Sequence, residues 1–135
     1  MRTKEYDVST GKIIDPEQWK AAFFIDSQED EDLLVPLLRE KRYRMLGVTN
    51  KESEALELLR KHKVGLLFVD DEIPGLDVEA LLVEIQRRHK GFNVILIGGH
   101  ITKEKLNTAV KLGAVGYLSK PLQKQAVEKM LGRVA

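Results

Sequence analysis

Short runs of consecutive apolar residues alternate along the chain with longer segments in which apolar residues recur at every third or fourth position. An uninterrupted run of branched and aromatic residues is typical of a strand buried on both faces, whereas the wider spacing is typical of a helix with one buried side. The runs that predict strands are Ala21–Ile25, Tyr43–Val48, Val64–Val69, Val94–Ile97 and Val115–Leu118. The segments that predict helices are approximately Glu29–Glu40, Lys51–His62, Asp77–His89, Lys103–Leu112 and Lys124–Arg133.

Several of these helix boundaries carry local signals. Thr49 and Glu52 have the spacing of a capping box, Thr102 can cap the fourth helix, and Gly113 follows the point where that helix should stop. Pro36 falls inside the first helical segment, where it removes one backbone hydrogen-bond donor. We therefore expect the first helix either to be kinked or to begin later than its pattern suggests.

Five repeats of a strand followed by a helix predict an α/β fold of three layers, with a parallel sheet between two layers of helices. Connections between parallel strands are right-handed, and the flavodoxin-like strand order 2-1-3-4-5 fits this pattern best. Ligands of such folds bind beyond the carboxyl ends of the strands, where the strand order reverses. Asp26 ends the first strand, Asp70 ends the third and Lys120 follows the fifth. We expect these three residues to meet in one pocket.

Two neighbouring carboxylates and a lysine suggest chemistry with a cation or a phosphate. Carboxylates that are held close together repel each other unless one is protonated or a cation lies between them. Magnesium suits such oxygen ligands, and an ammonium group can pair with phosphoryl oxygens. A carboxylate in this position could be a metal ligand, an acid or base, or a nucleophile that attacks phosphorus and forms an acyl phosphate.

The composition narrows the class of protein. The chain has 135 residues, which fits one domain, and its 22 lysines and arginines nearly balance its 21 aspartates and glutamates. That balance argues against a sequence-independent grip on nucleic acid or on an anionic membrane. Cysteine is absent, so disulfides, thiolate metal sites and a cysteine nucleophile are excluded. No apolar stretch approaches the ~20 residues that span a bilayer, and we expect a cytoplasmic protein.

Three segments together resemble the receiver domain of two-component response regulators, over approximately residues 20–133. The stretch 69–77, Val-Asp-Asp-Glu-Ile-Pro-Gly-Leu-Asp, is similar to the family's segment around its phosphoacceptor aspartate. The stretch 54–59, Glu-Ala-Leu-Glu-Leu-Leu, resembles the family's second helix. The stretch 113–121, Gly-Ala-Val-Gly-Tyr-Leu-Ser-Lys-Pro, resembles the segment that carries the family's lysine. The combination is much more specific than any one segment.

The resemblance implies a role for each matching residue at the strand ends. Asp70 would be the phosphoacceptor, and Lys120 would bind the phosphoryl group. Asp26, Asp70 and the backbone carbonyl of Glu72 would hold Mg²⁺. Receivers normally end the first strand with two acidic residues, whereas Asp26 is followed here by Ser27, so we expect a weaker metal site in which Asp26 could instead cap the next helix. The neighbouring acidic residues at 29 and 30 could reach back into this site.

The resemblance also implies a conformational switch, and here the sequence departs from the family a second time. Tyr117 matches the family's conformational aromatic residue, and Pro121 matches a proline that usually follows a cis peptide bond. Gly98 stands where the family has a Thr or Ser whose hydroxyl bonds the phosphoryl group and is followed by the aromatic residue. Because Gly98 has no hydroxyl, we expect modification of Asp70 to be coupled weakly or differently to Tyr117, which could equally be an ordinary packing residue.

We divide the chain into an N-terminal extension, residues 1–19, which is mostly polar and ends at Trp19, and a receiver-like domain, residues 20–135. The first hypothesis is a non-enzymatic receiver that takes a phosphoryl group on Asp70 from a histidine kinase or phosphotransfer protein. It would signal to a downstream protein by contact. The alternative is a phosphorylation-independent pseudo-receiver that docks or dimerises through the face between its fourth and fifth helices. A small-molecule enzyme is a distant third, because no glycine-rich phosphate loop follows the first strand.

Overall fold

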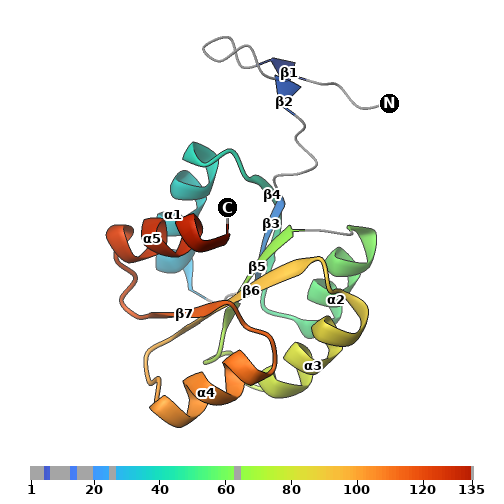
Figure 1. Ribbon diagram of the computed structural model, residues 1–135, viewed down its shortest axis with the longest axis vertical. Helices are drawn as coiled ribbons and strands as arrows, with labels where there is room; N and C mark the ends of the chain where they lie inside the picture. The colour runs from blue at the N-terminus through green and yellow to red at the C-terminus, as the bar shows by residue number, and fades with distance from the viewer. Residues whose placement is uncertain (1–4, 7–12, 15–19, 25–26, 63–64, 135) are drawn as a thin grey trace.

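A five-stranded parallel sheet organises the chain in the computed structural model, which describes residues 5–6, 13–14, 20–24, 27–62 and 65–134. Its strands are β3 (Lys20–Phe24), β4 (Arg44–Thr49), β5 (Gly65–Asp70), β6 (Phe92–Gly98) and β7 (Gly116–Ser119). They lie in the order β4-β3-β5-β6-β7, and every neighbouring pair is parallel (Figure 1). The predicted α/β class and the predicted order 2-1-3-4-5 are therefore confirmed.

Helices cover both faces of this sheet and complete the three layers (Figure 1). The first face carries α1 (Gln28–Glu40) and α5 (Lys124–Val134). The second face carries α2 (Glu52–Lys61), α3 (Val78–Arg88) and α4 (Lys103–Lys111). Among the described residues, no helix combines the length and the hydropathy that crossing a bilayer requires.

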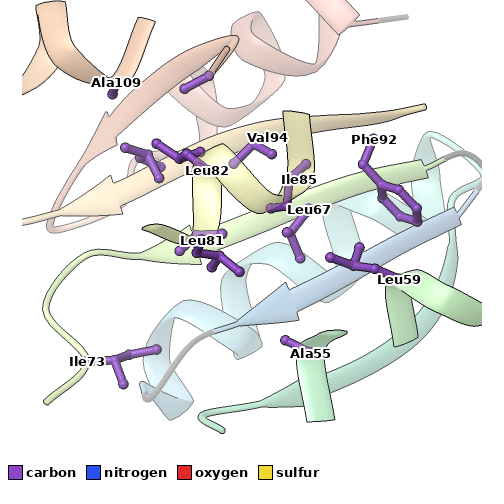
Figure 2. Close-up of a cluster of buried hydrophobic side chains, with 13 residues drawn as sticks. Ala55, Leu59, Leu67, Ile73, Leu81, Leu82, Ile85, Phe92, Val94 and Ala109 are labelled. Carbon is purple, nitrogen blue, oxygen red and sulfur yellow. The ribbon is translucent and has the colours of Figure 1, made fainter. Parts of the chain in front are cut away.

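The two central strands, β5 and β6, are apolar on both faces, which explains why they appear in the sequence as continuous runs. Leu66 and Phe68 of β5 pack toward α1 and α5, whereas Leu67 and Val69 belong to the cluster beneath α2, α3 and α4. Figure 2 shows this second cluster, in which Leu81 and Leu82 of α3 and Leu59 of α2 lie against strand residues such as Leu67 and Val94. Successive strand residues thus enter opposite cores, as the two-residue period of a strand requires.

Helix α1 contains Pro36 in its interior and begins at Gln28, so the expectation of a later start is wrong. The Ser27 side chain caps the helix, because its Oγ accepts a hydrogen bond of 3.3 Å from the backbone N–H of Asp30. The proline ring lies on the exposed side, while Leu34, Leu37 and Leu38 are buried. The buried leucines and the N-terminal cap stabilise the helix, so that it continues past Pro36 although the proline has no backbone N–H to donate.

The capping box expected at Thr49 is also absent. Lys51 is the N-cap of α2 and makes no side-chain capping bond. The Thr49 hydroxyl instead donates to Glu54 Oε2 at 2.6 Å and accepts from the backbone N–H of Lys51 at 3.1 Å. The other two boundary signals are confirmed: Thr102 caps α4 by accepting from the Lys105 N–H at 3.1 Å, and Gly113 follows that helix with a φ of +100°.

Two short segments of the N-terminal region form an antiparallel pair, β1 (Glu5–Tyr6) and β2 (Ile13–Ile14), which the sequence did not predict. Trp19, the end of the expected extension, and Asp26 lie outside the described residues. The division of the chain at residue 20 therefore stays a prediction. At the edge of the main sheet, the register of β4 against β3 shifts after the Ala21–Met45 pair, so that Ala22 faces Gly47 and Leu46 is the extra residue.

The packing of α1 against the sheet predicts a large cost for truncating its most buried side chain. Leu34 is 0% exposed. Leu34→Ala should lower the free energy of unfolding by about 2–5 kcal/mol, through lost burial and the cavity it leaves, as measured by urea denaturation. Val110→Ala, at a position that is 53% exposed, is the matched control and should change it by less than ~0.5 kcal/mol. Equal effects for the two variants would contradict this assignment of the core.

Candidate functional site

The carboxyl ends of β5, β6 and β7 meet at one edge of the sheet, and the backbone fixes their alignment. Asp70 is paired in register with Ile97, and Gly98 with Ser119. Two further hydrogen bonds continue the alignment beyond the strands: the Asp71 N–H donates to Ile97 O at 2.9 Å, and the Lys120 N–H donates to Gly98 O at 2.8 Å. The side chains that follow these strands are therefore held in one place.

Asp70 and Lys120 form a close ion pair at this edge. Lys120 Nζ donates to Asp70 Oδ2 at 2.6 Å, and the backbone N–H of Glu72 donates to Asp70 Oδ1 at 2.9 Å. Asp70 is only 2% exposed, so its carboxylate depends on these donors rather than on water. Burial lowers the pKa of Lys120, but the hydrogen bond and the negative charge of Asp70 outweigh it, so the pKa lies above its usual value.

A second buried carboxylate, Asp30 in the first turn of α1, faces the same ammonium group. Asp30 is 6% exposed, and its Oδ2 lies 3.6 Å from Lys120 Nζ, which is an ion-pair distance but beyond a hydrogen bond. This oxygen is buried, and among the residues that the structure describes it has no hydrogen-bond partner. Burial raises the pKa of Asp30, although the Lys120 charge acts in the opposite direction. The pocket thus holds a carboxylate oxygen that a further cation or donor could satisfy.

Glu72 bridges the loops that follow β5 and β6. Its Oε1 accepts from the backbone N–H of Gly99 at 2.7 Å and lies 3.1 Å from Nδ1 of His100, and its Oε2 lies 3.5 Å from Lys120 Nζ. The hydrogen bonds from His100 and then from Gly99 lower the pKa of Glu72. The His100 side chain is 90% exposed, and it is paired with this carboxylate.

Tyr117 points toward the ends of β5 and β6. Its hydroxyl donates to Asp71 Oδ2 at 3.0 Å. A Cβ atom built on Gly98 would overlap both the Tyr117 hydroxyl and Asp71 Oδ1, and it would lie 2.8 Å from Asp71 Cγ. The tyrosine hydroxyl and the Asp71 carboxylate therefore fill the space that a side chain at position 98 would need.

The residues that the sequence pointed to are largely brought together. Asp70, Lys120, Gly98 and Tyr117 gather at the strand ends, and the peptide bond between Lys120 and Pro121 is cis, the geometry that the resemblance implied. Asp26 lies outside the described residues, so its expected place beside Asp70 is untested.

Two further residues belong to this site. Asp71 had no expected role, although the missing side chain at Gly98 was a signal that something else must fill that space. Asp30 had been considered only as a substitute metal ligand. Its position three residues after a helix-capping serine was the available signal, because it places the side chain in the first turn of a helix that starts at the pocket.

The site is suited to bind a cation or an anionic group between carboxylates and an ammonium. Among the described residues, no three His, Cys, Asp or Glu side chains converge closely enough to form a complete metal centre. Magnesium, however, is often held by one or two carboxylates with water and carbonyl oxygens. The orphaned Asp30 oxygen and the Asp70 carboxylate fit that donor set.

Comparisons with known proteins agree on one family. Residues 26–132 match the family model described as the response regulator receiver domain. The chain is 28% identical over 108 residues to a chemotaxis protein CheY of Halobacterium salinarum, covering 80% of this chain and 90% of that protein. It is also 28% identical over 112 residues to a putative NtrX-like response regulator of Rickettsia bellii, covering 81% of this chain but only 23% of that protein. The chain therefore spans less than a quarter of the length of the second relative.

A solved structure supports the same fold. An orphan response regulator of H. pylori superposes with a TM-score of 0.76 at 18% identity, covering 90% of this chain and 100% of that one. At this level of identity the likeness concerns the architecture alone.

The Lys120 ion pair predicts a stability cost for removing its charge. Lys120→Met would leave the buried Asp70 carboxylate, and Asp30 beside it, without the ammonium, so the free energy of unfolding at neutral pH should fall by about 1–3 kcal/mol in urea denaturation. Lys124→Met is the matched control, because the exposed Lys124 lies 4.0 Å from Glu128 in a surface pair. It should cost less than ~0.5 kcal/mol. A Lys120 variant as stable as the control would show that the pair contributes nothing to folding.

Proposed function

The chain belongs to the response regulator receiver domain family of two-component signalling, and on that premise we propose that Asp70 accepts a phosphoryl group from a histidine kinase or a phosphotransfer protein. The observation that carries the proposal is the hydrogen bond of 2.6 Å between Lys120 Nζ and Asp70 Oδ2 at the mouth of the sheet. It puts a buried carboxyl group beside the positive charge that would pair with a phosphoryl group. The modified protein would then signal to a downstream protein by contact.

The chemistry follows from the groups around Asp70. A carboxylate oxygen forms a bond to phosphorus while the bond from phosphorus to the donor's imidazole nitrogen breaks, and the imidazole leaves with the electron pair and takes up a proton. Oδ2 accepts a hydrogen bond from Lys120 Nζ and Oδ1 accepts one from the Glu72 N–H, so each oxygen keeps a second lone pair for attack on phosphorus, and attack would bring the phosphoryl oxygens close to these two donors. Lys120 is the donor best able to turn toward the phosphoryl oxygens, because its ammonium group lies at the end of a flexible side chain.

We further propose that Asp30, with Asp70, holds Mg²⁺ in place of the acidic residue that Ser27 replaces. Asp30 offers a buried oxygen that has no hydrogen-bond partner within the described part of the chain and lies 3.6 Å from Lys120 Nζ. Asp26 and the backbone carbonyl of Glu72 complete the set on sequence grounds. When bound, the ion would neutralise charge on the phosphoryl group and on the two carboxylates.

The second candidate is a pseudo-receiver that docks or dimerises without phosphorylation. The observation that favours it is the face formed by α4, β7 and α5, where Leu106 and Val110 are exposed beside a hollow of about 700 Å³. Val115 and Met130 also line this hollow. A contact on this face would bury apolar surface whether or not Asp70 is modified.

Phosphoryl transfer is tested with the purified chain, acetyl phosphate and magnesium. Intact-mass measurement should show the addition of one phosphoryl group, and Asp70→Asn should abolish it because the amide is not a nucleophile. Asp77→Asn is the matched control, since Asp77 caps α3 from the same loop and should leave the adduct unchanged. The absence of an adduct at every magnesium concentration would favour the pseudo-receiver.

Magnesium binding is tested separately by calorimetry and by the rise in melting temperature that a ligand of the native state produces. Asp30→Asn should weaken Mg²⁺ binding by about 10-fold or more, because it removes one anionic oxygen from the site. Glu31→Gln removes one negative charge from the neighbouring residue of α1 and should leave the affinity nearly unchanged. Equal affinities for the wild type and Asp30→Asn would exclude Asp30 as a ligand.

A further inference from the structure

The side chain of Tyr117 is held in place by a contact that involves neither Asp70 nor Lys120. Its hydroxyl donates to Asp71 Oδ2 at 3.0 Å and lies directly over Gly98. Position 98 of β6 borders this space, and a Cβ there would overlap both partners. The glycine is therefore what allows the tyrosine and the aspartate to meet.

Asp71 is well placed to fix the tyrosine. Its backbone N–H is anchored to Ile97 O at 2.9 Å, so its position relative to β6 is set by the sheet. Burial raises the pKa of Asp71, and the hydrogen bond from Tyr117 acts against that rise. Burial, followed by the nearby charge of Asp71, raises the pKa of Tyr117, so the phenol keeps its proton and remains a donor. In this partly desolvated place, the tyrosine supplies a hydrogen-bond donor to the carboxylate, and the carboxylate supplies an acceptor to the hydroxyl.

Tyr117 lines two hollows. The first is a cavity of about 510 Å³ between α3 and α4, which Asp71 and Lys105 also line. The second is the hollow of about 700 Å³ beside Leu106 and Val110 on the α4–β7–α5 face. A ring that swung away from Asp71 would move toward that hollow and change the shape of the face.

We propose that Asp71 is a positioning residue that holds Tyr117 over Gly98 in the unmodified chain, so that the α4–β7–α5 face keeps one shape whether or not Asp70 carries a phosphoryl group. The part of this inference that concerns modification rests on the proposed function, whereas the part that concerns Asp71 does not. Because position 98 has no side chain, no hydroxyl at that position can relay a change at Asp70 to the tyrosine. The position of the Tyr117 ring depends instead on its hydrogen bond to Asp71.

The test uses the full chain labelled with 3-fluorotyrosine and observed by fluorine NMR. The sequence has three tyrosines, so three signals are expected, and Tyr117→Phe identifies the one that belongs to Tyr117. The first arm contains no phosphoryl donor. Asp71→Ala should shift or broaden the Tyr117 signal, because the ring loses its acceptor. Asp71→Asn should restore the wild-type position, because the amide oxygen still accepts, but it should lower the pH at which Tyr117 ionises.

Glu79→Gln is the matched control for this arm, because Glu79 lines the same cavity but is not the acceptor of the tyrosine hydroxyl. It should leave both the signal and the ionisation unchanged. Gly98→Ala offers an independent route to the same result, since the added Cβ should displace the tyrosine and give a signal like that of Asp71→Ala. A Tyr117 signal that is the same in the wild type, in Asp71→Ala and in Gly98→Ala would overturn the proposal.

The second arm adds acetyl phosphate and magnesium and follows the adduct by mass. In the wild type, the Tyr117 signal should stay in place while the phosphoryl adduct forms. A signal that moves in proportion to the adduct would overturn the claim that the face keeps one shape. If no adduct forms, the proposed function fails, but the first arm still decides whether Asp71 positions the tyrosine.

Discussion

The burial of the Asp70 carboxylate beside the Lys120 ammonium is the constraint around which the site is arranged. The two residues are fifty positions apart, and they meet at 2.6 Å only because β5, β6 and β7 end in register. A charge that is 2% exposed tolerates few arrangements, because each missing donor costs free energy. Asp30 and Glu72 pair with the same ammonium group. Its positive charge offsets the repulsion between the carboxylates that gather at these strand ends.

Most of the fold could be predicted from the sequence, because the central strands have to be apolar on both faces and the helices on one. The failures were local. Thr49 and Glu52 had the spacing of a capping box, but α2 begins after Lys51, and Thr49 bonds Glu54 instead. Pro36 suggested a kink or a later helix start, yet α1 begins at Gln28, because buried leucines on the opposite side outweigh one missing backbone hydrogen bond. Such outcomes depend on tertiary packing, which no local pattern records.

The candidate site was predictable only where a residue ends a strand. Asp70 and Lys120 could be placed because parallel strands finish at a common edge, and topology alone brings them together. Asp71 could not, because its partner Tyr117 is forty-six positions away and their contact depends on an empty space at Gly98. The orientation of Asp30 follows from the exact residue at which α1 begins, and sequence patterns locate that residue only to within a turn.

The shift of register in β4 has a consequence beyond the pocket. An open sheet has two outer strands, and unpaired N–H and C=O groups on such strands can recruit the strands of other molecules. Here β7 contains only four residues, and the extra Leu46 interrupts the regular pairing of β4 with β3. Neither margin presents a long, flat template for intermolecular sheet growth. The molecule can therefore expose apolar side chains on α4 to a partner while its backbone discourages runaway self-association.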